Sequence, residues 1–366
     1  MTTLVASEPR FVSLAAIERE LARPWQHPGG RREEQTTRAL MGNLIAVCRS
    51  QPERAGLERE VAQIVPHYPT RALLLVADPA NQSAGIAASI ALQGCIRGSS
   101  LQICGELVII GAGGPATPRL ASVARAVLLG DLPTSLWWAS PEAPPLAGEL
   151  FSQLAELADQ VIYDSAAWAD PLRQLVVTAN WVSGSGRQVA SDLAWRRARL
   201  WRRIIAQSLD PTLAPGALEG IEEAHIEHGP HALTQAWLLS GWLALRLGWV
   251  PRGGTLLPGP GVSWSFEWPH GRPRVEIRRH PEGEPDIRTV RIVTRVDGRP
   301  VTFRFELQAA GRVAVSAERL TGRVLSLTGP VYSRSALVAR QLPDLARDRL
   351  FESSVALART MAEAVL

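Results

Sequence analysis

A glycine-rich turn is the first stretch of the sequence that could bind a ligand. In VIIGAGGPATPRL (108–120), an apolar run meets a helical pattern through Gly111, Gly113 and Ala116. This spacing matches the dinucleotide fingerprint, in which glycines let the backbone approach a pyrophosphate at a helix N-terminus. The fingerprint also needs an acidic residue at the end of the next strand, about 20 positions on, whereas Asp131 precedes that strand. A strand-to-helix turn without a ligand is therefore the preferred interpretation, and a nucleotide-binding enzyme is the alternative.

Histidines and carboxylates gather in EEAHIEHGPH (222–231), and both side-chain types are zinc ligands. On a strand, Glu223, His225 and Glu227 share one face and His228 points to the other. A metal would then be offered His225 and Glu227, although three converging ligands are usual. A solvated strand edge is preferred, and no metal is assigned.

Arginines are concentrated in LAWRRARLWRRIIAQSLD (193–210). The members are Arg196, Arg197, Arg199, Arg202 and Arg203. They could contact phosphates of a nucleic acid, or they could form the outer face of an amphipathic helix, stacked on tryptophan or paired with acids. The formal net charge of +4 is close to balanced and disfavours a nucleic-acid partner.

No catalytic constellation is found. The chain has no nucleophile elbow, P-loop, HExxH or CxxC motif, and the spacing of Asp164 and Asp192 defines no acid–base pair. The three cysteines form no secreted disulfide framework. If Ser99 and Ser100 centre a hairpin turn, Cys95 and Cys104 lie opposite each other. Because the sequence contains none of these motifs and no acid–base pair, we assign no catalytic residue and no cofactor.

The elements that must position these residues fall into an N-terminal α/β domain and a C-terminal α+β domain. Residues 1–35 form a loose, partly helical segment, and 36–185 form a mixed sheet layered with helices. Residues 186–366 carry a long helix, an antiparallel meander over about 262–328 and a C-terminal helix. Further expectations are a helix over 36–50, strands over 70–78, 85–97, 100–110 and 221–228, and helices over 118–131, 147–160, 170–182, 190–208, 231–248 and 341–365.

Bulk composition is that of a soluble globular protein, with 46% hydrophobic and 20% charged residues. No window approaches the roughly 20 apolar residues of a membrane helix, and the N-terminus lacks a secretory signal pattern. We therefore expect a cytoplasmic protein with no membrane partner.

Two adjacent tryptophans, Trp137 and Trp138, follow the turn of DLPTSLWW (131–138). Neighbours in a strand face opposite sides of the sheet. Buried parallel strands are apolar on both faces, which favours the core for both rings. A partner-facing patch is the alternative for one of them.

Several segments together resemble the glucose-6-phosphate dehydrogenase assembly protein (OpcA) family. They are LQGCIRGSSLQICGELVII, ARAVLLGDLPTSLWWASPEAPP, VIYDSAAWADP, DLAWRRARLWRRIIAQSLDP and AWLLSGWLALRLGW, in this order. The resemblance implies a non-catalytic partner that binds glucose-6-phosphate dehydrogenase and favours its active oligomer or conformation in the oxidative pentose phosphate pathway. It implies structural roles for Asp131, Pro133, Trp137, Trp138, Trp201, Trp242 and Trp249. Candidate partner-binding residues are Trp138, Arg196, Arg199 and Arg203.

Overall fold

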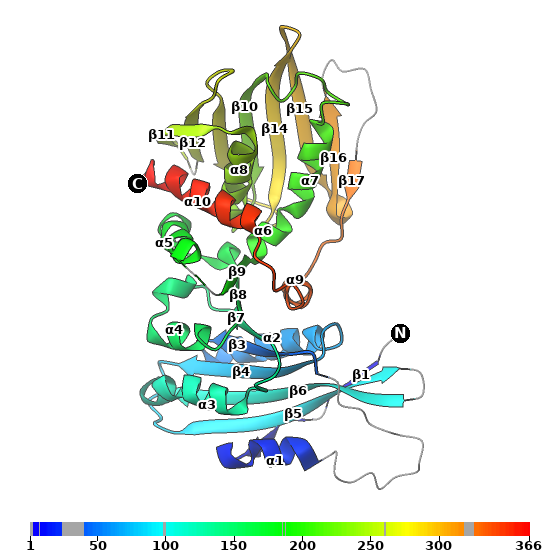
Figure 1. Cartoon of the computed structure of the whole chain (residues 1–366). Coiled ribbons are helices and arrows are strands. Elements are labelled where there is room, and N and C mark those ends of the chain that lie inside the picture. The colour runs from blue at the N-terminus through cyan, green and yellow to red at the C-terminus, as the bar shows by residue number, and fades with distance from the viewer. Residues whose placement is uncertain are drawn as a thin grey trace. The chain divides into compact units, whose positions relative to one another are not determined.

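The chain folds into two units in a computed structural model (Figure 1). The structure describes residues 3–6, 8–23, 40–97, 100–184, 186, 188–259, 261–317 and 326–366. The first unit comprises 1–163, 185–191 and 333–347, and the second comprises 164–184, 192–332 and 348–366. The sequence placed one boundary at 186, whereas the chain passes between the units several times.

The first unit is built on a mixed sheet with the order β1-β5-β6-β4-β3-β7-β8-β9, and β2 pairs with β5. Its strands are β1 Thr3–Ala6, β2 Arg10–Val12, β3 Gly42–Cys48, β4 Thr70–Asp78, β5 Ile86–Arg97, β6 Ser100–Gly113, β7 Thr134–Trp138, β8 Gln160–Tyr163 and β9 Val189–Asp192. Strands β6, β4, β3, β7 and β8 are parallel, and β5 is antiparallel to β6. The central parallel strands β3 and β7 are buried along their whole length, as expected for a sheet covered on both faces.

The helix expected over 36–50 is wrong where the structure describes it. Residues Gly42–Cys48 form β3, which lies between β4 and β7. A short run that is apolar all round cannot be assigned to helix or strand by periodicity, which explains the error. The helix begins just afterwards, as α2 Gln51–Ile64.

The β5–β6 hairpin has a different register from the expected one. Cys95 pairs with Gln102, so the expected pairing of Cys95 with Cys104 is wrong. A register irregularity follows Gln93, and Cys104 has no partner residue opposite it in β5. The position of a turn cannot be fixed to one residue from a Gly-Ser-Ser sequence, and each one-residue slip changes every pair.

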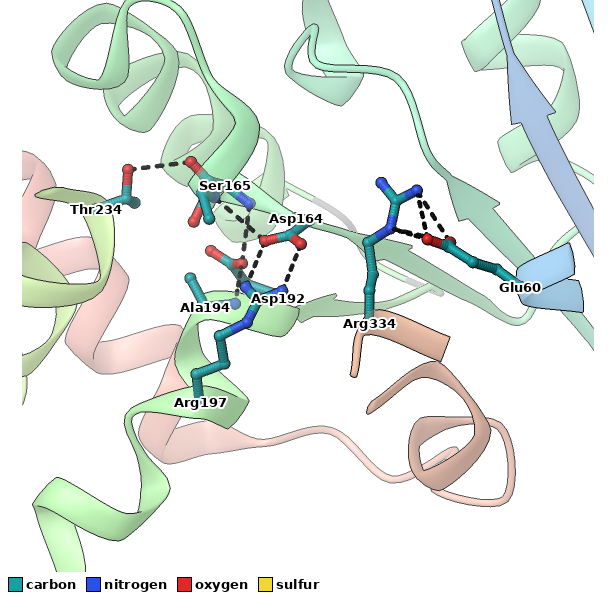
Figure 2. Close-up of polar contacts among 9 residues, drawn as sticks. Glu60, Asp164, Ser165, Asp192, Ala194, Arg197, Thr234 and Arg334 are labelled. Carbon is teal, nitrogen blue, oxygen red and sulfur yellow. Dashed lines mark hydrogen bonds and ion pairs between the residues drawn. The ribbon is translucent and has the colours of Figure 1, made fainter. Parts of the chain in front are cut away.

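The remaining helices of the first unit are α1 Ile17–Ala22, α3 Leu120–Val127, α4 Glu149–Ala155 and α9 Arg334–Gln341. Helix α9 comes from near the C-terminus and contacts α2 through Arg334, whose Nη2 lies 2.9 Å from the Glu60 carboxylate (Figure 2). Ser335 Oγ donates a 2.7 Å hydrogen bond to Gln63 Oε1. The first unit therefore depends on a segment distant in sequence.

The second unit contains an eight-stranded sheet with the order β11-β12-β13-β10-β14-β15-β16-β17. Its strands are β10 Ile221–His228, β11 Val250–Leu257, β12 Gly261–Glu267, β13 Arg274–Arg279, β14 Ile287–Val296, β15 Arg299–Gln308, β16 Arg312–Ala317 and β17 Ser326–Thr328. Strand β10 is parallel to β13 and antiparallel to β14, so it interrupts the expected meander. Alternating polarity reveals strands but does not reveal which strands are neighbours, so the sequence could not place β10.

The helices of the second unit are α5 Pro171–Gly184, α6 Leu193–Arg197, α7 Arg199–Ser208, α8 Leu233–Leu247 and α10 Arg349–Glu363. The long helix expected over 190–208 is in fact β9, α6 and α7. The helix expected over 341–365 is α10, which begins only at Arg349. Helix α8 packs on the sheet, where Trp237 meets Trp264 edge-on at 4.7 Å between ring centroids. Among the described residues, no helix is long and apolar enough to cross a membrane.

Candidate functional site

Both tryptophans of β7 are core residues, which confirms the favoured interpretation. Trp137 and Trp138 are fully buried. Trp138 Nε1 donates a 3.1 Å hydrogen bond to the carbonyl of Glu142, and its ring meets Phe151 edge-on at 5.4 Å. The Arg334 guanidinium lies 5.3 Å from the centre of the Trp137 ring. Trp138 is therefore not available on the surface as a partner-binding residue.

The turn before β7 is fixed by Asn43 of the neighbouring strand β3. The Asn43 backbone N–H donates to the carbonyl of Pro133 at 2.8 Å. Its side-chain Nδ2 donates to the carbonyls of Leu129 and Leu132 at 2.9 and 3.2 Å. Asp131 is exposed at this turn. The hydrogen bonds from Asn43 hold the DLPT segment in place and so orient the strand that carries the tryptophans.

The tryptophans of the other family segments are also core residues. Trp201, Trp242 and Trp249 are buried. The Trp249 ring lies 5.5 Å from the ring of Phe266 between centroids. These side chains contribute packing rather than a docking surface.

The glycine-rich turn ends strand β6 and is crowded by the segment that follows β4. A Cβ atom on Gly113 would lie 2.4 Å from the carbonyl oxygen of Ser83 and 2.5 Å from that of Asn81. Gly113 is therefore required by the close approach of two backbone segments. The following residues, Gly114–Arg119, form a 3-10 helix, and Ala116 is buried. By contrast, a Cβ on Gly111 would meet nothing nearer than Gln51 Nε2 at 4.0 Å.

The turn after β3 is where a doubly wound sheet of this topology carries its phosphate-binding glycines. Here the sequence is Arg49-Ser50-Gln51-Pro52, without glycine. The Glu53 carboxylate accepts a 3.0 Å hydrogen bond from the backbone N–H of Arg49. A carboxylate thus occupies the start of α2, where the fold would place an anion.

The arginines of α6 and α7 divide into internal and exposed members. Arg197 makes two 2.7 Å hydrogen bonds to the carboxylate of Asp164 (Figure 2). The Arg202 guanidinium lies 3.4 Å from the centre of the Trp195 ring and donates to the Trp195 carbonyl at 2.8 Å. Arg199 and Arg203 are exposed, and Arg196 is half-buried. The basic surface is therefore smaller than the sequence indicates.

A second carboxylate, Asp192, lies beside the Asp164–Arg197 pair and is 3% exposed. It caps α6 by accepting a 2.8 Å hydrogen bond from the Ala194 N–H, and it accepts another at 3.2 Å from the Ser165 N–H. Burial, reinforced by the negative charge of Asp164, raises the pKa of Asp192 to about 7. Figure 2 shows the two carboxylates with Arg197 directed at Asp164. The sequence analysis noted both Asp164 and Asp192 but did not bring them together, and the helix expected over 190–208 placed Asp192 inside a helix rather than at its N-cap.

A third acid of the second unit, the half-buried Asp286, is also held by hydrogen bonds. It accepts a 2.6 Å hydrogen bond from Gln235 Nε2 and a 2.7 Å bond from the Ile287 N–H. Burial raises the pKa of Asp286, while the charge of Arg197 opposes this shift. Asp192 and Asp286 are thus two acids of this region whose pKa values are raised by burial.

His225 and Glu227 lie on β10 as expected, on one face of the sheet. His225 Nε2 lies 2.9 Å from the Glu223 carboxylate, so its nearest acid is Glu223. His228 is buried on the other face, and its Nδ1 donates to the Gly229 carbonyl at 2.7 Å. Within the described ranges, no three His, Cys, Asp or Glu side chains converge on a possible metal position.

Comparison with known proteins relates both units to one family. The N-terminal domain of the glucose-6-phosphate dehydrogenase subunit (OpcA) family matches residues 61–180, and the C-terminal domain of that family matches 188–355. The OxPP cycle protein OpcA of Nostoc punctiforme is 34% identical over 155 residues, which are 42% of this chain and 32% of that relative. The protein of the same name from Synechocystis is 32% identical over 158 residues, 43% of this chain and 32% of the relative. The alignments thus span about a third of these relatives.

The overall fold is similar to that of an oxidoreductase from Sinorhizobium meliloti. The TM-score is 0.51 with 10% sequence identity, over 89% of this chain and 97% of that chain. At this identity the likeness concerns the fold alone. The two family domains, which follow one another over most of the sequence, identify this chain as a member of the OpcA family of glucose-6-phosphate dehydrogenase subunits.

Proposed function

We propose that this protein binds glucose-6-phosphate dehydrogenase and acts as a non-catalytic assembly factor or activator in the oxidative pentose phosphate pathway. The observation that carries the proposal is the match of both family domains, which are named for that enzyme's subunit. The names of the cyanobacterial relatives, which refer to the OxPP cycle, agree with it.

The non-catalytic part is supported by the turn after β3. A dehydrogenase with a doubly wound sheet binds the pyrophosphate of its cofactor at this turn, where glycines let the backbone approach. This chain has Arg49 and Pro52 there, and Glu53 accepts the Arg49 N–H. A negative charge at this point repels phosphate, and Pro52 offers no N–H.

The proposed docking surface is the basic face formed by the exposed Arg199 and Arg203 and the half-buried Arg196. These residues are three and four positions apart, which places them on one side of consecutive helices α6 and α7. Two internal contacts hold these helices in place. Arg197 donates to the Asp164 carboxylate, and Trp195 Nε1 donates to Asp348 at 2.9 Å. Arginine on a rigid support is a residue type favoured at interface hot spots.

Activation needs no chemistry from this chain. A protein that binds the active form of an enzyme more tightly than the inactive form shifts the equilibrium towards the active form. Each tenfold difference in affinity corresponds to about 1.4 kcal/mol. A preference of about a hundredfold for the active form would convert a mostly inactive population of the enzyme into a mostly active one.

The direct test mixes the purified chain with glucose-6-phosphate dehydrogenase from the same organism. We expect the two to co-elute in size-exclusion chromatography, and we expect the apparent KM for glucose 6-phosphate to fall or the active oligomer to increase. An unrelated dehydrogenase is the control. If neither co-elution nor a kinetic change occurs, the proposal is wrong.

A nucleic-acid partner remains the competing explanation for the arginines. Arg197 and Arg202 are committed to internal contacts, which leaves fewer cations for phosphates. A gel shift with duplex DNA and RNA separates the two explanations, because phosphate-driven binding weakens steeply as salt increases. We expect no shift at physiological salt.

A further inference from the structure

A cavity of about 240 Å³ lies at one edge of the first sheet. Gln51 lines it just after the end of β3, Asn81 and Ser83 line it after β4, and Gly111 lines it near the end of β6. Because these strands are parallel, their carboxyl ends meet at this edge (Figure 1). In open α/β sheets, ligands bind outside the carboxyl ends of the strands.

The polar lining of the cavity is suited to an anion. Among the described residues that line the cavity, Arg54 is the only charged one, and none is a carboxylate. Arg54 Nε lies 3.8 Å from the Glu58 carboxylate, and both side chains are about one-third exposed. Asn81 Oδ1 accepts the Ser83 N–H at 2.9 Å, which leaves Asn81 Nδ2 as a donor. A guanidinium with amide donors recognises phosphate or carboxylate groups.

The apolar part of the lining is suited to a planar ring. Phe11 lines the cavity from β2, opposite Ser89 of β5, and it is 81% exposed. Such exposure of a phenyl ring on an ordered strand leaves its apolar face in water. A stacked aromatic ring would remove that face from water and gain the offset contact that aromatic pairs prefer.

We propose that this cavity binds a nucleoside monophosphate, with its base against Phe11 and its phosphate near Arg54. A dinucleotide would need the phosphate-binding turn after β3, where Glu53 lies. The site uses Gly111, which the sequence singled out, but in a different geometry from the fingerprint. It belongs to this chain alone and does not depend on a dehydrogenase partner.

The test places a larger side chain in the cavity by substituting a residue that lines it. In Gly111→Val, the new side chain has open space, since the nearest atom to its Cβ is Gln51 Nε2 at 4.0 Å, and valine is favoured in strands. Arg54→Gln removes the charge from a half-exposed helix position and is the second variant. Gly56→Ala is the matched control, because it lies on α2 and its Cβ would meet no atom within 4 Å.

Binding of AMP, GMP, CMP and UMP to the full chain is measured by isothermal titration calorimetry, with circular dichroism to confirm that each variant is folded. We expect saturable binding of at least one of the four. We expect Gly111→Val and Arg54→Gln to weaken it at least about tenfold, and Gly56→Ala to leave it unchanged.

The matching nucleoside and inorganic phosphate are expected to bind at least about tenfold more weakly than the nucleotide, because each makes half of the contacts. The proposal is overturned if none of the four saturates below about 10 mM, or if folded Gly111→Val binds as well as the native chain. Inorganic phosphate binding as tightly as the nucleotide would also overturn it. All of these measurements are independent of dehydrogenase binding.

Discussion

Two buried ionic clusters, one in each unit, differ in how their charges are balanced. In the first unit, Arg71 of β4 is fully buried and bound on several sides. Its Nε donates to Glu106 at 2.7 Å, and its Nη1 donates to the Val127 carbonyl at 2.7 Å and to Glu18 at 2.5 Å. This cluster has a cation at its centre, with acceptors around it.

In the second unit, two carboxylates share the surroundings of one arginine. Arg197 directs both Nη groups at Asp164, and Asp192 is held by backbone N–H groups. Burial and the nearby Asp164 charge raise the pKa of Asp192 to about 7. A buried cation that is fully bound therefore serves stability, whereas an excess carboxylate makes a region sensitive to pH.

The largest expected effect is that of removing the central cation of the first cluster. Arg71→Met leaves the Glu106 carboxylate buried without its arginine, and breaking a buried pair in this way costs about 3–5 kcal/mol. Chemical denaturation should show this loss of unfolding free energy. Arg19→Met is the control, because Arg19 is largely exposed and surface substitutions change stability by about 0.5 kcal/mol or less. A loss for Arg71→Met as small as the control's would contradict the comparison.

Removing the arginine of the second cluster should cost less. Arg197 is 22% exposed, so solvent reaches part of the pair and Asp164 can be rehydrated after Arg197→Met. We expect a loss of about 2–3 kcal/mol in unfolding free energy at neutral pH. A loss of about 0.5 kcal/mol or less, as for an exposed arginine, would contradict this expectation.

Asp192 should give the second unit its own pH dependence. Because its pKa is higher in the folded protein than in the unfolded chain, the folded state holds a proton that the unfolded state releases, and stability falls as pH rises from about 4 to about 7. Asp192→Asn keeps the cap of α6 but cannot ionise. Between about pH 5 and pH 8, the unfolding free energy of the variant relative to the native chain should rise by about 1–3 kcal/mol.

The control for this pH dependence is Asp210→Asn. Hydrogen bonds from the Thr212 hydroxyl and N–H lower the pKa of exposed Asp210. Its contribution to pH dependence therefore lies below about pH 4, and the control should be flat between pH 5 and pH 8. Equal slopes for the Asp192 variant and the native chain would refute the role given to the excess carboxylate.

The smallest effect on stability is expected outside both clusters, on the exposed face of α7. Arg199→Glu and Arg203→Glu together should change the unfolding free energy by about 0.5 kcal/mol or less, because both side chains are exposed. A thermal melt checks this. A large destabilisation would show that these arginines support the fold and would remove them as candidates for partner binding.

The sequence predicted features that depend on neighbouring residues along the chain. Alternation revealed β12 to β16, and the apolar run around Trp137 indicated a strand buried on both faces. It did not predict β3 or the insertion of β10 between β13 and β14, because these depend on pairing between distant segments. Family resemblance, rather than any single site, pointed to the function.

The candidate site shows the same limit. The arginines of α6 and α7 were visible in the sequence, but their division into internal and exposed members depends on Asp164 and Trp195. The environment of Asp192 required the fold, since Ser165 is distant from it in the chain. Gly111 was noticed for its spacing, yet the cavity beside it is formed by three strand ends.

We propose that this chain binds glucose-6-phosphate dehydrogenase through the basic face of α6 and α7. The most direct test of this claim is a calorimetric titration of the dehydrogenase with the native chain, with the Arg199→Glu/Arg203→Glu variant, and with a control of equal charge change, Arg125→Glu/Arg173→Glu, at two other exposed positions. We predict that the native chain and the control bind alike and that the α7 variant binds at least about tenfold more weakly. Absence of native binding, or equal binding by all three, would contradict the claim.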